Sequence, residues 1–260
     1  MNKRHLALRQ ILMIMVVQGW VSHAWADITV SAAISLAGVL EKVQPALEAE
    51  AGEKISFTFG ASGTLAGQIQ QGAPVDLFIS ADRANVEKLV AAKVVEPAAV
   101  TVIAENALVL IQPKGAAPLG GFADLAKVKR IAIGEPKVVP AGMYARETLV
   151  SLKLWEELEK AGKLVSCENV AQVVTLVDRG EVDAGLVYRT DALNAKNVRL
   201  AAEAEASTHS KIEYVSAVVA AGTHKAAAEK LQRALASEKV VAVLRERGFV
   251  VAGKSAAPEK

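Results

Sequence analysis

The stretch FTFGASGTLAGQIQQGAPVDLFISAD, residues 57–82, decides the fold. It begins in an apolar strand pattern over 55–59, passes through the small and hydroxyl residues GASGT, and continues as a helical pattern over 64–71 that stops at Gly72. A second apolar strand pattern follows at 76–80. Strands and helices that alternate in this way are typical of α/β proteins with mostly parallel strands.

The same alternation extends outward over most of the chain. Further strands are expected at 28–33, 107–113, 130–134, 181–188 and 214–220. Helices are expected from Leu36, after Asp82, over 141–155, over 170–179 and, as two amphipathic helices, over 223–247. Pro45 predicts a kink or break in the helix from Leu36, because an interior proline costs ~3 kcal/mol through a lost hydrogen bond and a ring clash. Only the tail, residues 254–260, is expected to be unstructured.

Composition excludes several classes of protein. The chain has 260 residues, enough for one to two domains, and its 30 basic and 28 acidic residues leave no basic surplus for a nucleic-acid partner. The single cysteine, Cys167, excludes an intramolecular disulfide and a cysteine-rich zinc site. Stability must therefore come from an apolar core.

Residues 1–26 have the features of a cleavable signal peptide. Three basic residues precede an apolar run at 11–17, and Ala-Trp-Ala at 24–26 supplies the small-x-small pattern of a cleavage site. A membrane anchor is the alternative, but the run is shorter than the ~20 apolar residues that span a bilayer. Cleavage predicts a periplasmic protein whose net charge is 27 − 28 = −1, since the three basic residues leave with the signal.

Four places share one arrangement, in which a strand runs through small or hydroxyl residues into a helix. Their key residues are Ser35; Ser62, Gly63 and Thr64; Pro140, Ala141 and Gly142; and Asn169 and Val170. The first turn of a helix has N–H groups without internal partners and attracts anions. Tyr188, at the end of a strand, adds a phenolic O–H. These segments predict a site for an oxyanion.

The first two of these segments contain no arginine or lysine. A cage of uncharged donors holds a fully ionised oxyanion but offers no acceptor for the proton of a protonated phosphate, so it favours a dianion that carries no proton. The alternative is that the small residues only cap helices and form turns, as they do in any α/β protein. Tyr188 has its own alternative, a half-buried tyrosine whose hydroxyl is satisfied within the protein.

At these segments the chain resembles the periplasmic molybdate-binding proteins of ABC transporters. The likeness rests on AAISLAGVLEKV at 32–43, on the stretch at 57–82, on IAIGEPKVVPAGMYARETL at 131–149 and on ENVAQVVTLVDRGEVDAGLVY at 168–188. The resemblance implies a monomer of two lobes that closes on molybdate or tungstate and delivers it to a membrane permease, with no cofactor and no catalysis. It further implies that hydrogen bonds, rather than direct coordination of the metal, hold the oxyanion. The implied binding residues are Ser35, Ser62, Ala141, Val170 and Tyr188.

The resemblance also implies a lobe layout. Residues 27–105 with 215–253 would form lobe 1 and residues 106–214 would form lobe 2, each a mostly parallel sheet flanked by helices, with the ligand cleft between them. The chain would cross between the lobes near Glu105–Asn106 and near Tyr214. Only the closed arrangement lets both lobes touch the anion, so the ligand would shift the equilibrium toward closure.

Two other functions stay open at this stage. Sulfate has the same charge and shape as molybdate but is smaller, and the size of a cage cannot be derived from a sequence. A serine hydrolase is a weaker alternative, because the sequence around Ser62 lacks the last glycine of the Gly-x-Ser-x-Gly elbow. The two histidines outside the signal, His209 and His224, lie in polar segments where solvation is expected.

Overall fold

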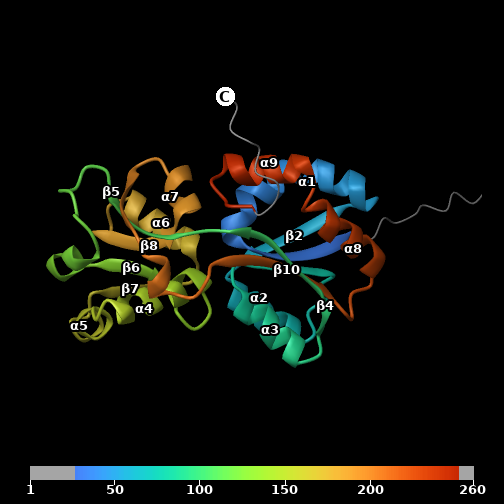
Figure 1. Ribbon diagram of the computed structural model, residues 1–260, viewed down its shortest axis with the longest axis horizontal. Coiled ribbons are helices and arrows are strands. Elements are labelled where there is room, and N and C mark those ends of the chain that lie inside the picture. Colours follow the sequence, from blue (N-terminus) through green and yellow to red (C-terminus); the bar gives the residue numbers. More distant parts are fainter. Residues whose placement is uncertain (1–26, 252–260) are drawn as a thin grey trace, which may run out of the picture.

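The structure is a computed structural model that describes residues 27–251; the predicted signal peptide and the tail after Gly253 lie outside these residues. Two α/β lobes lie side by side (Figure 1). We call the half built on the sheet β2-β1-β3-β10-β4 lobe 1, and the half built on the sheet β7-β6-β8-β5-β9 lobe 2.

Lobe 1 places its sheet between two layers of helices. Its strands are β1 (Ile28–Ala33), β2 (Ile55–Gly60), β3 (Leu77–Ser80), β4 (Val95–Glu105) and β10 (Glu213–Val219). Helices α1 (Ala37–Ala51), α8 (Lys225–Ala234) and α9 (Glu238–Glu246) lie on one side, and α2 (Ser62–Gln70) and α3 (Arg83–Ala91) on the other (Figure 1). The sheet separates two cores: Leu77 and Ile79 of β3 pack with the α1 layer, whereas Phe78 packs with the α2 and α3 layer.

Lobe 2 repeats this plan. Its strands are β5 (Leu108–Pro113), β6 (Ile131–Gly134), β7 (Leu164–Cys167), β8 (Ala184–Tyr188) and β9 (Val198–Glu203). Helices α4 (Pro140–Ser151) and α5 (Trp155–Lys160) lie on one side, and α6 (Val170–Asp178) and α7 (Arg189–Asn194) on the other (Figure 1). Short 3₁₀ helices η1 (Ile34–Leu36), η2 (Phe122–Lys127) and η3 (Ala206–Thr208) complete the elements.

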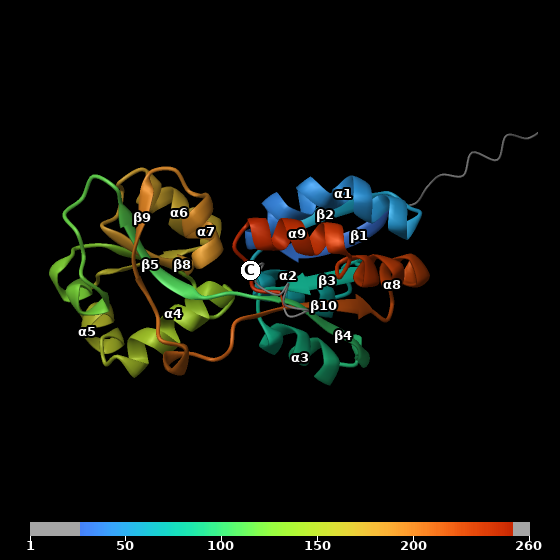
Figure 2. The same cartoon turned by 45° about the horizontal axis from the view of Figure 1, so that its top comes forward.

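The chain passes between the lobes along two adjacent segments. The first runs from β4 into β5, and the second runs from η3 into β10 (Figure 2). They pair with each other, because the Asn106 N–H donates to the Ile212 carbonyl at 3.2 Å and β10 pairs antiparallel with β4, with Glu213 opposite Glu105. The crossing is therefore a two-stranded ribbon.

The expected two-lobed α/β fold is confirmed, with sheets that are mixed in their pairings. In lobe 1, β2, β1 and β3 pair in parallel, and β10 pairs antiparallel with both β3 and β4. In lobe 2, β6 pairs in parallel with β7 and β8, and β5 pairs antiparallel with β8 and β9. One reversed strand in each sheet, β10 or β5, breaks the otherwise common direction, and each adjoins the crossing.

Two helix predictions change. Of the kink or break expected at Pro45, the break does not occur, because α1 runs through the proline. Pro45 lies on the exposed side, where water can satisfy the carbonyl that loses its partner, while Val43 and Leu47 stay buried. The single helix expected over 141–155 is two helices. Lys153 adopts a left-handed φ of 60° between α4 and α5, and the Leu154 N–H returns to the Leu149 carbonyl at 2.8 Å.

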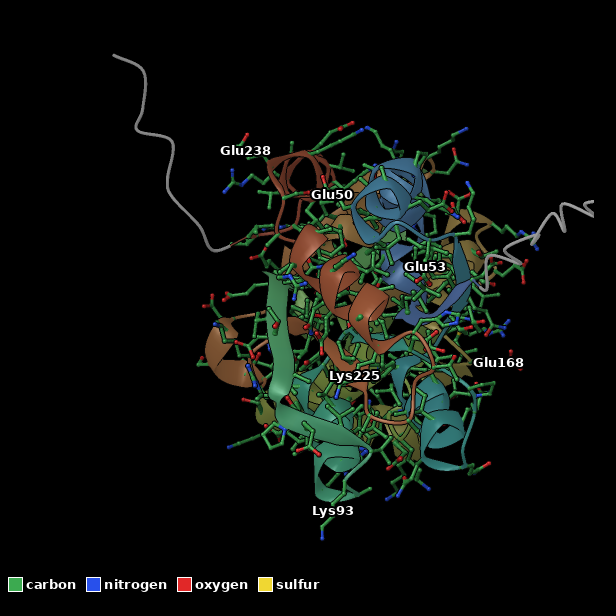
Figure 3. All side chains as sticks on the ribbon, turned by 90° about the vertical axis from the view of Figure 1, so that its right-hand side faces the viewer. Glu50, Glu53, Lys93, Glu168, Lys225 and Glu238 are labelled. Atoms are coloured by element: carbon green, nitrogen blue, oxygen red, sulfur yellow. The ribbon has the colours of Figure 1, made fainter. Side chains whose placement is uncertain are left out.

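The outer surface carries charges of both signs. On the face of lobe 1 that Figure 3 presents, Glu50, Lys93, Lys225 and Glu238 are all exposed and interspersed. Within residues 27–251 no helix combines the length and the apolar character needed to cross a bilayer.

Candidate functional site

One small cavity lies between the lobes at the carboxyl ends of the central strands. Its volume is about 10 Å³, far below the ~300–1,000 Å³ of pockets for drug-sized ligands. Ligands of open α/β sheets bind at this end of the strands. The lining residues include all five that the sequence predicted: Ser35, Ser62, Ala141, Val170 and Tyr188.

Lobe 1 contributes two serines. Ser35 lies in η1, directly after β1, and its Oγ is 2.8 Å from the hydroxyl of Tyr214. Ser62 is the first residue of α2 and is fully buried. Because the Oγ of Ser62 accepts a hydrogen bond from the Ala81 N–H at 3.0 Å, its own proton is left for another acceptor.

Lobe 2 contributes two backbone amides and a phenol. Ala141 follows Pro140 at the start of α4, and Val170 is the first residue of α6. Tyr188 ends β8, and its hydroxyl lies 3.5 Å from the Ala81 carbonyl of lobe 1, which is at the limit of a hydrogen bond. Burial raises the pKa of Tyr188 well above 10, so the phenol keeps its proton and acts as a donor.

Two of the helix starts at this cavity, those of α2 and α4, are buried and lack side-chain caps. Neither α2 nor α4 has a side-chain cap, and their first-turn residues Ser62 and Ala141 are 0% and 1% exposed. Among the hydrogen bonds found within residues 27–251, none starts from the N–H of either residue. Ordinary capping therefore does not explain these two junctions, and a buried helix end without partners calls for an external acceptor. At α6, by contrast, Asn169 caps the N–H of Gln172.

Among residues 27–251, none with a charged side chain lines the cavity. The polar side chains of the lining are the hydroxyls of Ser35, Ser62 and Tyr188, which are set among alanine, valine and isoleucine side chains. Such a lining stabilises negative charge through dipoles and hydrogen bonds rather than through a counter-ion.

The two lobes touch at the rim of this cavity. The Gly63 N–H donates to the Val138 carbonyl of lobe 2 at 2.9 Å. A Cβ on Gly63 would stand 2.6 Å from that same oxygen, so only glycine allows this approach.

Comparison with known proteins now identifies the family. Residues 28–250 match the family model of bacterial extracellular solute-binding proteins. The chain belongs to this family. It is 39% identical over 224 residues to YvgL of Bacillus subtilis, described as an ABC transporter substrate-binding lipoprotein, with 85% of each chain covered. It is 34% identical over 231 residues to the molybdate-binding protein ModA of Escherichia coli, which covers 86% of this chain and 89% of ModA.

Solved structures agree with this assignment. The periplasmic molybdate-binding protein of Azotobacter vinelandii superposes with a TM-score of 0.78 at 26% identity, over 87% of this chain and all of that one. The sulfate-binding protein SubI of Mycobacterium tuberculosis shares the fold, with a TM-score of 0.72 at 18% identity over 86% of each chain. The fold is therefore common to receptors for different anions.

Members of this family are solute-binding proteins, not enzymes, and the geometry around Ser62 agrees. His209 lies against Tyr144 with ring centroids 5.9 Å apart, and its Nδ1 contacts the Ser210 carbonyl. His224 faces Glu53 with 3.4 Å between Nδ1 and Oε2. Neither histidine lines the cavity that holds Ser62, so no described histidine is placed to act as its base.

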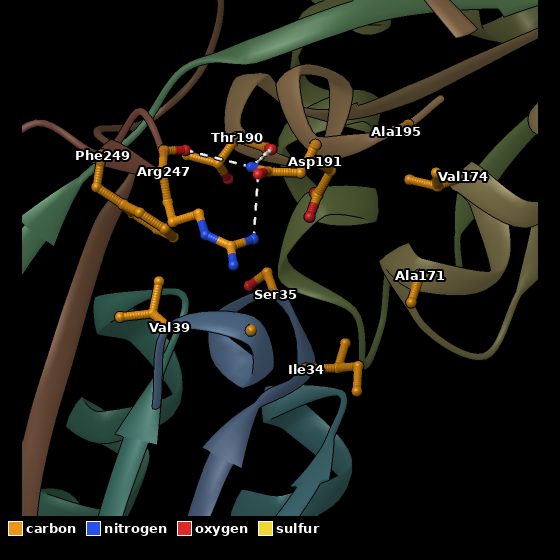
Figure 4. A pocket seen from close by; sticks show the side chains of 12 residues that line it. Ile34, Ser35, Val39, Ala171, Val174, Thr190, Asp191, Ala195, Arg247 and Phe249 are labelled. Atoms are coloured by element: carbon orange, nitrogen blue, oxygen red, sulfur yellow. Dashed lines mark hydrogen bonds between the residues drawn. The ribbon is translucent and has the colours of Figure 1, made fainter. Parts of the chain in front are cut away.

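A second cavity, next to the first, is lined by charged residues. The sequence motifs did not indicate these charges. Figure 4 shows Arg247, Asp191 and Thr190 around this cavity, with Ser35 on its floor. The Arg247 guanidinium donates across the lobes to Oδ1 of Asn194 at 3.2 Å. Burial raises the pKa of Asp191 to about 7, although its carboxylate accepts the Tyr188 N–H at 3.1 Å.

Sequence reasoning missed several residues of the site. Ala81 and Val139 line the cavity, and Tyr214 contacts Ser35 from behind. Ala81 follows a strand end, as the predicted residues do, so its position was a usable signal. Tyr214 was expected only as a crossing residue, and nothing local in the sequence connects it with Ser35, 179 residues away.

Proposed function

We propose that this protein binds molybdate, and tungstate with it, in the periplasm and delivers the ion to an ABC-type permease in the inner membrane. The observation that carries the proposal is the convergence of Ser35, Ser62, Ala141, Val170 and Tyr188, from separate segments, on one small cavity without charged groups. The similarity to ModA proteins over most of the chain supports the same ligand.

The donor set fits a tetrahedral dianion. Two serine hydroxyls, one phenol and the first-turn amides supply five or six donors. Hydrogen bonds to a charged acceptor contribute about 1.5–3 kcal/mol each, so the gross attraction is on the order of 10 kcal/mol. After association costs of several kcal/mol, a dissociation constant in the micromolar range or below follows.

The same donors select against protonated anions. Hydrogen phosphate needs an acceptor for its proton, and the phenol of Tyr188 stays protonated because burial raises its pKa well above 10. Sulfate carries no proton, so only the size of the cage can exclude it. A sulfate receptor is therefore the second candidate function, and the shared fold with a sulfate-binding protein keeps it open.

We further propose that the signal peptide at 1–26 is removed and that the mature protein works as a monomer. Its first lobe would comprise residues 27–105 with 215–253, and its second lobe residues 106–214. The end of β4 at Glu105 agrees with the first bound, whereas β10 of lobe 1 begins at Glu213, two residues before the second bound. Closure about the crossing would bring Ser35 and Ser62 to one side of the ion and Tyr188 to the other.

Thermal unfolding in the presence of four anions tests the proposal. At a concentration of 100 times the dissociation constant, a ligand of the native state adds about 2.7 kcal/mol, which raises Tm by roughly 5–10 °C for a protein of this size. We expect this shift with molybdate and tungstate and little shift with sulfate or phosphate. An equal shift with sulfate would favour the second candidate, and no shift with molybdate would contradict the proposal.

A further inference from the structure

Tyr214 lies directly behind Ser35, at the point where the chain crosses back into lobe 1. It is the second residue of β10, is fully buried, and packs between the rings of Tyr188 and Phe249, with centroids 5.7 Å and 5.1 Å away. Its hydroxyl is 2.8 Å from Oγ of Ser35. Tyr214 does not line the solute cavity, so it reaches the cavity only through Ser35.

Hydrogen bonds fix the orientation of the amide behind Tyr214. The Ala107 N–H, which can only donate, bonds Oδ1 of Asn106 at 2.9 Å. The other end of the Asn106 amide is therefore its NH₂ group, and it donates to Oγ1 of Thr190 at 2.9 Å. The Asn106 oxygen is thus engaged by Ala107, and within the described residues the hydroxyl of Tyr214 has one hydrogen-bond partner, Oγ of Ser35.

These constraints determine the direction of the next hydrogen bond. A buried phenolic O–H without an acceptor is costly, and Oγ of Ser35 is the acceptor that the structure offers to the fully buried Tyr214. The phenolic proton is therefore directed to Ser35. Burial raises the pKa of Tyr214 well above 10, which keeps that proton in place. The Ser35 oxygen accepts from Tyr214, and the Ser35 proton is left to point into the cavity.

We propose that Tyr214 is a positioning residue that holds the Ser35 hydroxyl as a donor toward the bound oxyanion, so that a residue at the crossing between the lobes orients a donor of the site. This inference rests on the proposed function. With the opposite polarity, Ser35 would donate to Tyr214 and present its lone pairs to a dianion, which repels them.

The test is a double-mutant cycle on molybdate binding, measured by isothermal titration calorimetry. Tyr214→Phe removes only the hydroxyl and is expected to weaken binding about tenfold, whereas Ser35→Ala weakens it about 10- to 100-fold. In the Ser35→Ala background, Tyr214→Phe should have no further effect, because its only route to the ligand is gone. Equal effects of Tyr214→Phe in both backgrounds would mean a merely structural role and would overturn the proposal.

Tyr144→Phe is the matched control. Tyr144 is also buried at the lobe junction, and its hydroxyl bonds the Lys211 carbonyl at 3.4 Å without contact to Ser35. The Tyr144→Phe variant should bind molybdate with the affinity of the wild type. A loss equal to that of Tyr214→Phe would show that any buried phenol at the junction matters and would count against the proposal.

A spectroscopic measurement gives an independent arm if Tyr214→Phe does not fold. The two-band ring signal of tyrosine in Raman spectra changes its intensity ratio when a phenol stops donating a hydrogen bond. Ser35→Ala removes the acceptor of Tyr214 and should shift this ratio away from that of donating phenols. An unchanged ratio would contradict the inference. If the wild type itself binds no molybdate, the proposed function fails instead, and the two failures are thereby distinguished.

Discussion

Ser62 links the start of α2 to the residue after β3. Its Oγ accepts the Ala81 N–H, which leaves its own proton for another acceptor, and the residue lines the cavity. We predict that Ser62→Ala weakens molybdate binding by ~1–3 kcal/mol, because one charge-assisted hydrogen bond is lost, while the protein stays folded. Calorimetry measures the change, with Ser216→Ala as control, since Ser216 is an equally buried serine that bonds the Thr101 carbonyl away from the cavity. An unchanged affinity would remove Ser62 from the site.

Asp191 makes stability depend on pH. Its pKa is raised to about 7 by burial, whereas an aspartate in the unfolded chain titrates near 4. Between these values the folded state holds a proton that the unfolded state has released, so the free energy of unfolding falls as pH rises from about 4 to about 7. Asp191→Asn should therefore unfold at a higher temperature than the wild type at pH 8 and at a similar one at pH 5. The same difference at both pH values would contradict this reasoning.

At the scale of single residues, the sequence indicated the candidate donors but not the residues behind them. Ser35 and Ser62 were recognisable because hydroxyl residues follow strands directly in the chain. Tyr214 was not recognisable as the proposed support of Ser35, because the two residues are far apart in the chain and only folding brings them into contact.

The start of helix α2 illustrates how an element controls lobe contact. A methyl group on Gly63 would overlap the Val138 carbonyl of lobe 2, and overpacking of this kind costs about 1–3 kcal/mol. Gly63→Ala should therefore weaken molybdate binding roughly 10- to 100-fold by keeping the lobes apart, with the melting temperature of the ligand-free protein little changed.

Gly67→Ala in the same helix is the matched control for this prediction. A Cβ there meets nothing within 4 Å, and alanine favours helix, so its affinity should equal that of the wild type. If Gly63→Ala bound molybdate as tightly as Gly67→Ala in calorimetry, the contact with Val138 would not belong to the bound state.

Among the elements, the strands missed by sequence reasoning share one property. β4, β7 and β9 all lie at sheet edges, where one side of the strand is exposed and the apolar pattern is weak; β4 even contains Pro97, which edges tolerate. The central strands were predictable because both of their faces are buried, as in β3 and β8.

The whole molecule is two lobes joined by a two-stranded ribbon, an arrangement suited to closure around a ligand. We predict that saturating molybdate lowers the radius of gyration in small-angle X-ray scattering, since contacts such as that between Tyr188 and Ala81 form only when the lobes meet. Sulfate at the same concentration should leave the scattering unchanged. An identical curve with and without molybdate would argue against closure on binding.

The most direct measurement for the central claim is a calorimetric titration of the purified protein with molybdate, followed by sulfate and phosphate. We expect one site per chain with a dissociation constant in the micromolar range or below for molybdate, and no measurable heat from the other two ions. No heat from molybdate, or equal affinity for sulfate, would contradict the proposed function.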